Sequence, residues 1–212
     1  PIQPSAAASE VYHPPARGSA RRLGDVPREL ALPLDDALLD RLAAGAAPHH
    51  AAYTLRSWVG DIPDDLALSW MTLSSSLMTE APTGEKEVEP EVVDVAALRE
   101  GEATVSKQGR TRYHTVALDE AGDVVACTDL VTTVHEPGRG YQWGTLVRGE
   151  DRGHRLGLAV KVANLRLLQR EVSDLARVTT WNAEVNHHMI DVNEQLGFSP
   201  VARLGEFQKR LT

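Results

Sequence analysis

A stretch rich in glycine and arginine, EDRGHRLGLAVK from Glu150 to Lys161, becomes apolar halfway along its length. The first turn of a helix carries backbone N–H groups without intrahelical partners, so a helix that begins here could bind a phosphate group. Glycine lets the backbone approach such an anion closely. The side chains of Arg152, His154 and Arg155 could add charge-assisted hydrogen bonds. The simpler alternative stays open, because a strand that turns into a helix also favours glycine at the turn.

Two common phosphate-binding loops fit this stretch poorly. A P-loop needs Gly-Lys followed by Ser or Thr at the helix start, and GHRLGLAVK contains no such triplet. A dinucleotide-binding fingerprint needs G-x-G-x-x-G after the first strand of a parallel sheet, whereas Gly149, Gly153 and Gly157 are spaced four residues apart. The strands that precede them also read as antiparallel. The sequence therefore disfavours both loops.

Apolar periodicity predicts the elements that must position this turn. Alternation favours strands over residues 53–60, 112–119, 124–135, 141–147 and 176–182, and helical spacing favours helices over 35–47, 61–78, 94–107, 183–198 and from about 156 onward. Gly101 is expected to interrupt the helix over 94–107, and Gly144 to mark a bulge or a close backbone approach in its strand. With one or two closing strands over 199–211, the order predicts a mixed α/β (α+β) fold.

The turn and its surroundings resemble the GNAT superfamily of N-acetyltransferases. RGHRLG, from Arg152 to Gly157, matches the family's motif A (Arg/Gln-x-x-Gly-x-Gly/Ala), except that Arg155 replaces the central glycine. The family's next motif has an Asn after the following strand and an aromatic-glycine end to its helix, and Asn186 and NEQLGF (Asn193 to Phe198) take those places. The order of elements over residues 53–212 is also that of the family.

The resemblance implies a GNAT-like mixed, mostly antiparallel sheet flanked by helices, with an N-terminal extension. It also implies acetyl-CoA as the cofactor. The backbone of residues 153–158 would hold the CoA pyrophosphate, and the end of the preceding strand would pair with the pantetheine arm. The residues expected to bind acetyl-CoA are Leu146, Val147, Arg148, Arg152, Gly153, His154, Arg155, Leu156, Gly157, Leu158, Asn182 and Asn186.

The activity implied by the resemblance is that of an acetyl-CoA-dependent N-acetyltransferase. Such an enzyme moves the acetyl group to the primary amine of a small molecule by direct attack on the thioester. The alternative is a GNAT-like domain that binds CoA or is non-catalytic, with a structural or regulatory role in a larger assembly. Arg155, Asn193 and Gly144 keep this alternative open, because each departs from a feature expected of an active member.

Five residues are candidates for acid–base chemistry. Many family members have a tyrosine four residues before the glycine of LGF, and this chain has Asn193, which cannot act as a general acid but could orient a water or cap the helix. A base must accept a proton from the attacking amine. The candidate bases on the acceptor side are Glu80, His135, Glu136 and Tyr141. Exposed Glu and His in loops are usually only solvated, which is the alternative for each of them.

Composition and charge narrow the classes of partner. A net charge of −8 disfavours a nucleic-acid partner, and the longest apolar runs, such as VVAC at Val124 to Cys127, are too short to span a membrane. Cys127 lies in an apolar run, so we expect a packed thiol and, since it has no partner in the chain, a cytoplasmic location. His187 and His188 are expected at the surface, and their adjacency does not favour metal binding, which would need i, i+4 spacing. No metal site is predicted.

The first 50 residues differ from the rest of the chain. Residues 1–33 are rich in Pro, Ala, Arg and Gly without clear periodicity. We therefore assign residues 1–50 to an extension, a linker or the remnant of a first domain, and residues 51–212 to a GNAT-like acetyltransferase domain. Residues 33–65 resemble the connector and second-domain start of tandem GNAT proteins such as mycothiol synthase. The partners expected are a small-molecule amine and either a second copy of the chain, as a homodimer, or a second GNAT-like domain.

Overall fold

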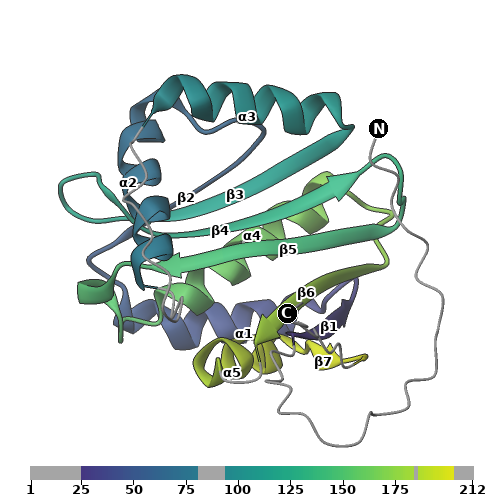
Figure 1. Cartoon of the computed structure of the whole chain (residues 1–212). Helices are drawn as coiled ribbons and strands as arrows, with labels where there is room; N and C mark the ends of the chain where they lie inside the picture. The colour runs from purple at the N-terminus through teal and green to yellow at the C-terminus, as the bar shows by residue number, and fades with distance from the viewer. Residues whose placement is uncertain (1–24, 81–93, 184–185, 203–212) are drawn as a thin grey trace, which may run out of the picture.

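Seven strands form one sheet in the order β2-β3-β4-β5-β6-β1-β7 (Figure 1). The computed structural model describes residues 25–80, 94–183 and 186–202, and the side chains of these residues apart from 25, 76–80 and 183. The strands are β1 (Asp25–Ala31), β2 (Thr54–Val59), β3 (Arg110–Leu118), β4 (Val124–Thr133), β5 (Arg139–Val147), β6 (Arg177–Ala183) and β7 (Ser199–Pro200). All neighbouring strands are antiparallel except β5 and β6, which are parallel.

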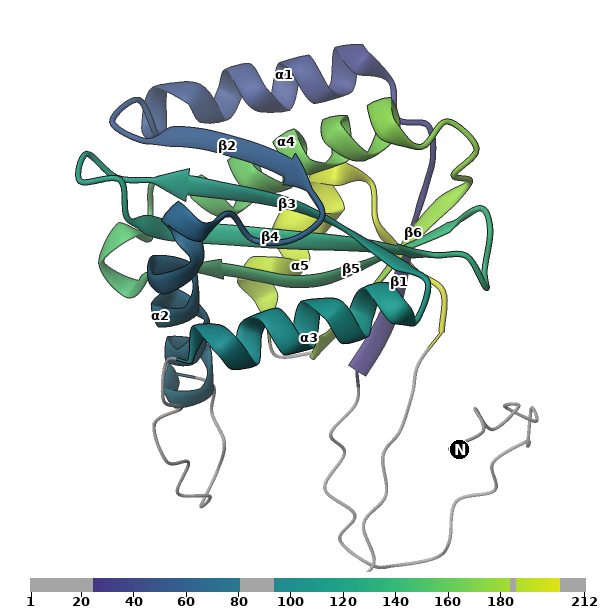
Figure 2. The same ribbon diagram turned by 90° about the horizontal axis from the view of Figure 1, so that it is seen from above.

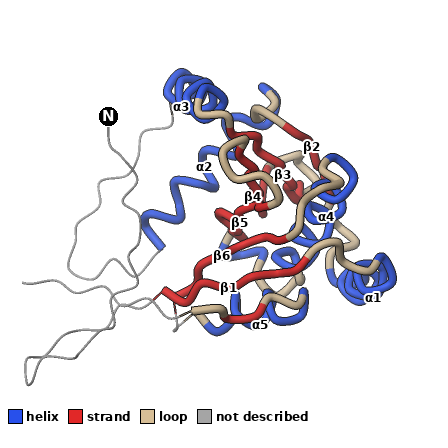
Figure 3. Tube along the Cα trace, turned by 90° about the vertical axis from the view of Figure 1, so that its right-hand side faces the viewer, coloured by secondary structure: helices blue, strands red, loops and turns tan. Residues whose placement is uncertain are grey.

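Helices cover both faces of the sheet. They are α1 (Asp36–Ala46), α2 (Asp64–Glu80), α3 (Val95–Lys107), α4 (Leu156–Glu171) and α5 (His187–Leu196), with short 3-10 helices η1 (Ala47–His49) and η2 (Gly149–Asp151). The view from above and the side view place α2 and α3 on one face and α1, α4 and α5 on the other (Figures 2 and 3). Below, these are called the α2 face and the α4 face. The sheet is therefore the middle layer of three.

The hydrophobic core lies mainly on the α4 face. Leu39 of α1, Leu165 and Leu168 of α4 and Leu196 of α5 are all at most 1% exposed and pack in one cluster with Leu130 of β4. A second cluster joins α2 to the α2 face of the sheet through Leu66, Leu73, Val116 and Cys127. Burial of these apolar side chains is the main stabilising term that holds the helices to the sheet.

Most of the predicted elements are confirmed within a few residues. The mixed, mostly antiparallel sheet flanked by helices is the predicted fold. Gly101 does not interrupt its helix, because α3 runs without a break from Val95 to Lys107 and Asp94 caps it by accepting hydrogen bonds from the backbone N–H groups of Ala96 and Ala97. Cys127 is buried, as expected, and burial raises the pKa of its thiol. Of the closing strands predicted over residues 199–211, the structure describes residues 199–202, which contain β7.

The first strand was not predicted. Residues 1–33 read as lacking regular structure, which is wrong for β1, a strand that pairs with β6 on one side and with β7 on the other. Its sequence, DVPRELA, does not show the apolar alternation typical of a strand, because the buried residue Arg28 is charged. Arg28 donates to the Glu194 carboxylate at 3.0 Å, and this long-range ion pair makes its burial tolerable. The buried apolar residues of this strand are Val26 and Leu30, on the α4 face, and Pro27.

Within the described residues, no helix has the length and apolar character needed to cross a bilayer.

Candidate active site

The sheet opens between β5 and β6. The two parallel strands pair only from Arg139 with Arg177 to Tyr141 with Thr179, and the rest of each strand continues without ladder pairing between them. Figure 1 shows the two ribbons starting together and then diverging. The diverging part of β5 contains the residues that lead into the glycine-arginine stretch. The opening therefore leaves backbone groups of β5 available to a ligand at this place.

A β-bulge lies on the other side of β5 at the same level. Thr128 pairs with Thr145 and Leu130 with Gln142, so the single residue Asp129 of β4 opposes two residues of β5, Trp143 and Gly144. Of the two alternatives expected at Gly144, a bulge or a close backbone approach, the structure has the bulge. A bulge bends a strand and increases its twist, which accounts for the divergence of β5 from β6 beyond this point.

The bulge is held by the side chain of Gln142. Its Nε2 lies 2.7 Å from the backbone oxygen of Asp129, 3.3 Å from that of Gly144 and 2.9 Å from Oγ1 of Thr128. Thr128 Oγ1 in turn lies 2.7 Å from Oγ1 of Thr145. A bulge takes carbonyl groups out of the regular ladder, and buried carbonyls need a donor. Gln142, 3% exposed, supplies it.

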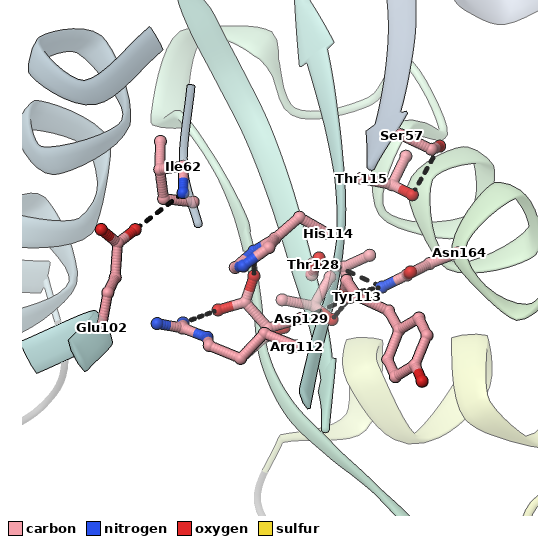
Figure 4. A network of polar contacts seen from close by, with 12 residues as sticks. Ser57, Ile62, Glu102, Arg112, Tyr113, His114, Thr115, Thr128, Asp129 and Asn164 are labelled. Atoms are coloured by element: carbon pink, nitrogen blue, oxygen red, sulfur yellow. Dashed lines mark hydrogen bonds and ion pairs between the residues drawn. The ribbon is translucent and has the colours of Figure 1, made fainter. Parts of the chain in front are cut away.

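A charged network lies against the bulge on the α2 face (Figure 4). Asp129 accepts from Arg112 at 2.8 Å and lies 2.6 Å from Nδ1 of His114, whose ring stacks on Trp58. Burial alone would raise the pKa of the Asp129 carboxyl, but His114 and Arg112 together lower it. The network fixes the position of Asp129, the β4 residue opposite the bulge.

A cleft of about 790 Å³ follows the opening, a size within the usual range of small-molecule sites. It runs from the end of β5, past the turn, to the first residues of α4, and α5 forms its other wall. The residues that line it are Thr145, Leu146, Val147, Asp151, Arg152, Gly153, Arg155, Leu156, Gly157, Leu158, Asn186, His188, Met189, Asp191, Val192 and Gln195.

The start of α4 has the properties of an anion site. No side chain caps the helix, so the N–H groups of its first turn have neither a capping side chain nor an intrahelical carbonyl. Gly153 has φ of +91°, a conformation that favours glycine, and it directs the chain into the turn. A Cβ on Gly157 would lie in van der Waals contact, 3.8 Å from Cγ2 of Val147, so a larger side chain here would extend into the start of the cleft.

Arg155 has the left-handed conformation that its glycine counterpart would adopt easily. Its φ is 52°, and it is the only residue other than glycine with positive φ in the described part of the chain. Its Nη1 donates to the backbone oxygen of Gly45 at 3.2 Å, next to the end of α1. His154 makes a similar contact, with Nδ1 at 3.1 Å from the oxygen of His49. The end of α1 and η1, which precede β2, therefore fix the turn before α4.

A second set of contacts fixes the segment just before the turn. Arg148 Nε donates to Asp151 at 2.5 Å, and its Nη2 donates to Asp119 at 3.1 Å. Tyr53 donates to the other oxygen of Asp151 at 2.8 Å, and its ring contacts that of His154 with centroids 5.5 Å apart. Because its proton is held by Asp151, the pKa of Tyr53 is raised. Arg148 is thus engaged by carboxylates.

The structure brings nine of the twelve expected cofactor residues together around the cleft. Three lie outside its lining: Arg148 and His154, which make the contacts just described, and Asn182, which is buried on β6. The cleft also contains residues that the sequence analysis missed, chiefly the α5 side chains of His188, Met189, Asp191, Val192 and Gln195. Their spacing along the helix places them on one side of it, and this was the available signal.

The candidate acid–base residues are spread over the sheet. His135 and Glu136 lie in the turn of the β4–β5 hairpin. Tyr141 lies near the start of β5, about 20 Å along the strand from Val147 at the cleft. Tyr141 donates to Glu136, and its ring stacks on Trp181 with centroids 5.9 Å apart. Desolvation and the bond to Glu136 raise the pKa of Tyr141.

Asn193 and Asn182 lie together, away from the cleft lining. Asn193 is fully buried and donates from Nδ2 to Oδ1 of Asn182 at 2.8 Å. Its own Oδ1 is buried without a partner in the described part of the chain. Glu80 ends α2, and its side chain lies outside the described residues. No group of three or more His, Cys, Asp or Glu side chains that could hold a metal occurs within the described ranges.

Comparison with known proteins gives matches among solved structures. No protein-family model and no curated protein matches the chain. A tandem GNAT protein from the clavulanic acid biosynthesis pathway, solved without acetyl-CoA, is 33% identical with a TM-score of 0.67, over 88% of this chain and 54% of that one. The chain thus spans about half of that protein.

Two further structures share the fold at lower identity. An acetyltransferase of Trypanosoma brucei is 20% identical with a TM-score of 0.51, over 75% of this chain and 99% of that one. An aminoglycoside acetyltransferase from an uncultured soil metagenomic sample, in complex with trehalose, is 11% identical with a TM-score of 0.54, over 76% and 98%. The 33% identity to the tandem GNAT protein over 88% of this chain, together with the strand order, shows that the chain belongs to the GNAT superfamily.

Proposed function

We propose that the chain is an acetyl-CoA-dependent N-acetyltransferase that moves an acetyl group to the primary amine of a small molecule. The observation that carries the proposal is the continuity of the cleft, which joins the uncapped start of α4 to the unpaired part of β5. A phosphate site and a free strand edge in one cleft suit a ligand with a pyrophosphate at one end and a chain of amide groups at the other.

The residues of the cleft fit CoA by their chemistry. The N–H groups of residues 153–158 would bind the pyrophosphate, with Arg152 and Arg155 beside it. The backbone of Leu146 and Val147 would pair with the pantetheine amides as if with a further strand. The apolar side chains of Met189 and Val192 on α5 would exclude water from that arm. When bound, acetyl-CoA supplies the acetyl group as an activated thioester.

The protein's part in the reaction is to orient the amine and to hold protons. A β5 N–H beside the bulge, left without a ladder partner, would donate to the thioester carbonyl. Tyr141 stands at the closed end of the opening, and desolvation and the bond to Glu136 raise its pKa, which favours the protonated phenol. We therefore favour Tyr141 as proton donor to the leaving thiolate, with Glu136 as its partner, in place of the buried Asn193.

Binding of CoA tests the proposal directly. Titration calorimetry with CoA and acetyl-CoA should give a measurable heat, and replacement of Gly157 by Phe should weaken both affinities at least about tenfold, since a large side chain would fill the start of the cleft. Gly101→Phe is the matched control, because a side chain at Gly101 meets open space. Unchanged affinity in the Gly157 variant would refute the assignment of the cleft.

A second candidate function is a CoA-binding or non-catalytic domain with a structural or regulatory role. Two observations favour it: Asn193 is buried against Asn182, and the chain spans about half of the similar tandem protein. In this second function, the chain would pair with a second GNAT-like domain or with a second copy of itself. Thiol release across a panel of amines separates the two functions: CoA binding with no release from any amine would favour the second.

A further inference from the structure

The inference concerns the acceptor amine and rests on the proposed function. An acceptor must reach the closed end of the opening, near the bulge. On the α4 face, the helices α1, α4 and α5 cover the sheet, whereas α2 and α3 leave the middle of β5 and β6 uncovered by described residues (Figures 1 and 2). The acceptor therefore approaches from the α2 face of these two strands.

That approach is lined by aromatic rings. Trp143 of β5 and Trp181 of β6 are 41% and 42% exposed, unusually large fractions for tryptophan on the middle strands of a sheet. Trp181 is on the α2 face because its neighbours Thr180 and Asn182 point to the other side, where Val178 joins the core. Tyr141 stacks on it. A Cβ on Gly144, beside Trp143, would meet nothing within 4 Å, so there is space at the bulge.

Two arginines contact Trp143 and differ in how they are paired. The guanidinium carbons of Arg112 and Arg110 lie 5.6 and 5.7 Å from the ring centroid. Arg112 is bound to Asp129 and is largely buried between Trp143 and Trp70. Arg110 is exposed and forms no ion pair with any residue in the described part of the chain. Its charge is therefore not balanced locally.

We propose that the acceptor is an amine that carries a carboxylate and a planar apolar group, the carboxylate bound by Arg110 and the planar group by Trp143 and Trp181. The Arg110 guanidinium lies over the Trp143 ring, and its planar fork of N–H donors can bind a carboxylate with two hydrogen bonds. The amine then lies at the bulge, beside the space at Gly144.

The charges around the approach argue against a polycationic acceptor. Glu136 accepts from Tyr141 and lies 3.9 Å from Arg139, and Glu29 of β1 is shared between Arg139 and Arg177. The described carboxylates on this side are thus engaged, while Arg110 is not. A polyamine would meet an unbalanced positive charge here, whereas an amino-acid-like acceptor would neutralise it.

The test compares acceptors and variants. Thiol release is measured with L-phenylalanine, phenethylamine, L-alanine and spermidine for the wild type, Arg110→Gln and Trp143→Leu, with Lys107→Gln as the control for loss of an exposed charge. The preference for phenylalanine over phenethylamine, as a ratio of kcat/KM, should fall about tenfold in Arg110→Gln and stay unchanged in the control. Trp143→Leu should weaken use of phenylalanine and spare alanine.

The outcomes separate this inference from the proposed function. An unchanged preference in Arg110→Gln, or spermidine as the best acceptor, would overturn the inference and leave the acetyltransferase intact. If neither CoA binding nor thiol release is seen, the proposed function fails, and saturation-transfer NMR with phenylalanine alone decides the binding site. Transfer in the wild type that is lost in folded Arg110→Gln, with thermal melting as the check of folding, would uphold the site; no transfer would sink it.

Discussion

Arg155 is the residue at which the chain departs from the motif of its superfamily, and the departure has a structural cost. A left-handed backbone costs a residue other than glycine about 1 kcal/mol or more. The cost is borne because the side chain is tied to the oxygen of Gly45. The arginine thus leaves the approach to the cleft open, since that bond directs one of its guanidinium nitrogens toward α1.

A pair of substitutions at this position tests the strain. Arg155→Gly and Arg155→Ala both lose the bond to Gly45, but only glycine adopts φ of 52° freely. The glycine variant should therefore be more stable than the alanine variant by about 1 kcal/mol in urea unfolding. At Arg166, exposed in the middle of α4, the same pair should show the opposite order by about 1 kcal/mol. If the glycine and alanine variants had the same order of stability at both positions, the left-handed backbone at Arg155 would not be strained.

Lys161 is a buried cation on α4 without a carboxylate partner in the described part of the chain. It is 1% exposed, its Nζ lies 5.7 Å from the centroid of the Phe198 ring, and burial lowers its pKa to about 7. The unfolded state keeps a pKa near 10.5, so between pH 7 and 10.5 it binds a proton that the folded state does not. Stability should therefore rise with pH over this range, and the full penalty should apply below pH 7.

Replacement by methionine removes this penalty. Lys161→Met should raise the free energy of unfolding at pH 6 by an amount on the order of 5 kcal/mol, and the gain should shrink as the pH approaches 10. Unfolding by urea at several pH values measures it. Lys107→Met, at an exposed position on α3, should change little at any pH. A gain that is independent of pH would show that Lys161 is already neutral or solvated in the fold.

At the scale of elements, the shape of the cleft depends on how β5 is bent. The bulge at Trp143 and Gly144 sets β5 apart from β6, and one side chain, Gln142, supplies donors to the carbonyls that the bulge leaves. The turn before α4 is likewise held by contacts from α1 and η1. The site is thus assembled by neighbouring elements, none of which contains it alone.

Gln142→Leu tests the role of the bulge. Loss of the donors should leave the backbone oxygen of Asp129 without its side-chain donor, whereas that of Gly144 keeps Oγ1 of Thr128 at 3.2 Å. The free energy of unfolding should fall by about 2 kcal/mol. If the bulge then shifts its register, CoA affinity should fall by more than the loss of stability explains, as measured on protein that is fully folded by circular dichroism. Gln108→Leu, at the exposed end of α3, is the control. If the Gln142→Leu variant is less stable but binds CoA with unchanged affinity, Gln142 has only a structural role.

At the scale of the whole molecule, residues 25–50 contribute a strand to the sheet and side chains to the core. β1 lies between β6 and β7, and Leu30, Leu39 and Ala46 are at most 2% exposed within the main hydrophobic cluster. The division of the chain into an extension of residues 1–50 and a domain of residues 51–212 remains a prediction. Because β1 and α1 contact the rest of the fold, truncation before residue 51 tests it.

Truncation provides that test. A chain that begins at residue 51 would lose burial worth more than about 5 kcal/mol, comparable with the whole stability of a domain, and should not unfold cooperatively. A chain that begins at residue 25 keeps these elements and should melt like the full sequence. Cooperative melting of the shorter chain would show that residues 51–212 fold independently.

The sequence by itself determined the elements and the turn. Helical and alternating periodicity arises from contacts within a few residues, which is why α1, the β3–β4 hairpin and α4 were predicted closely. The glycines before α4 signalled the turn at the start of that helix for the same reason, because their backbone requirement is local. The identity of Gly144 indicated either a bulge or a close backbone approach, and the pairing with β4 decided for the bulge.

Only the tertiary structure decided which side chains face the cleft. Arg148 and His154 read as phosphate ligands, but Asp119 and Asp151 bind the first and His49 and Tyr53 hold the second, residues up to 105 positions away in the sequence. Likewise β1 is a strand because it pairs with the distant segments β6 and β7, and a distant glutamate pairs its buried arginine. These outcomes depend on contacts between segments that are distant in the sequence and meet only in the folded sheet, so no local pattern of residue types predicts them.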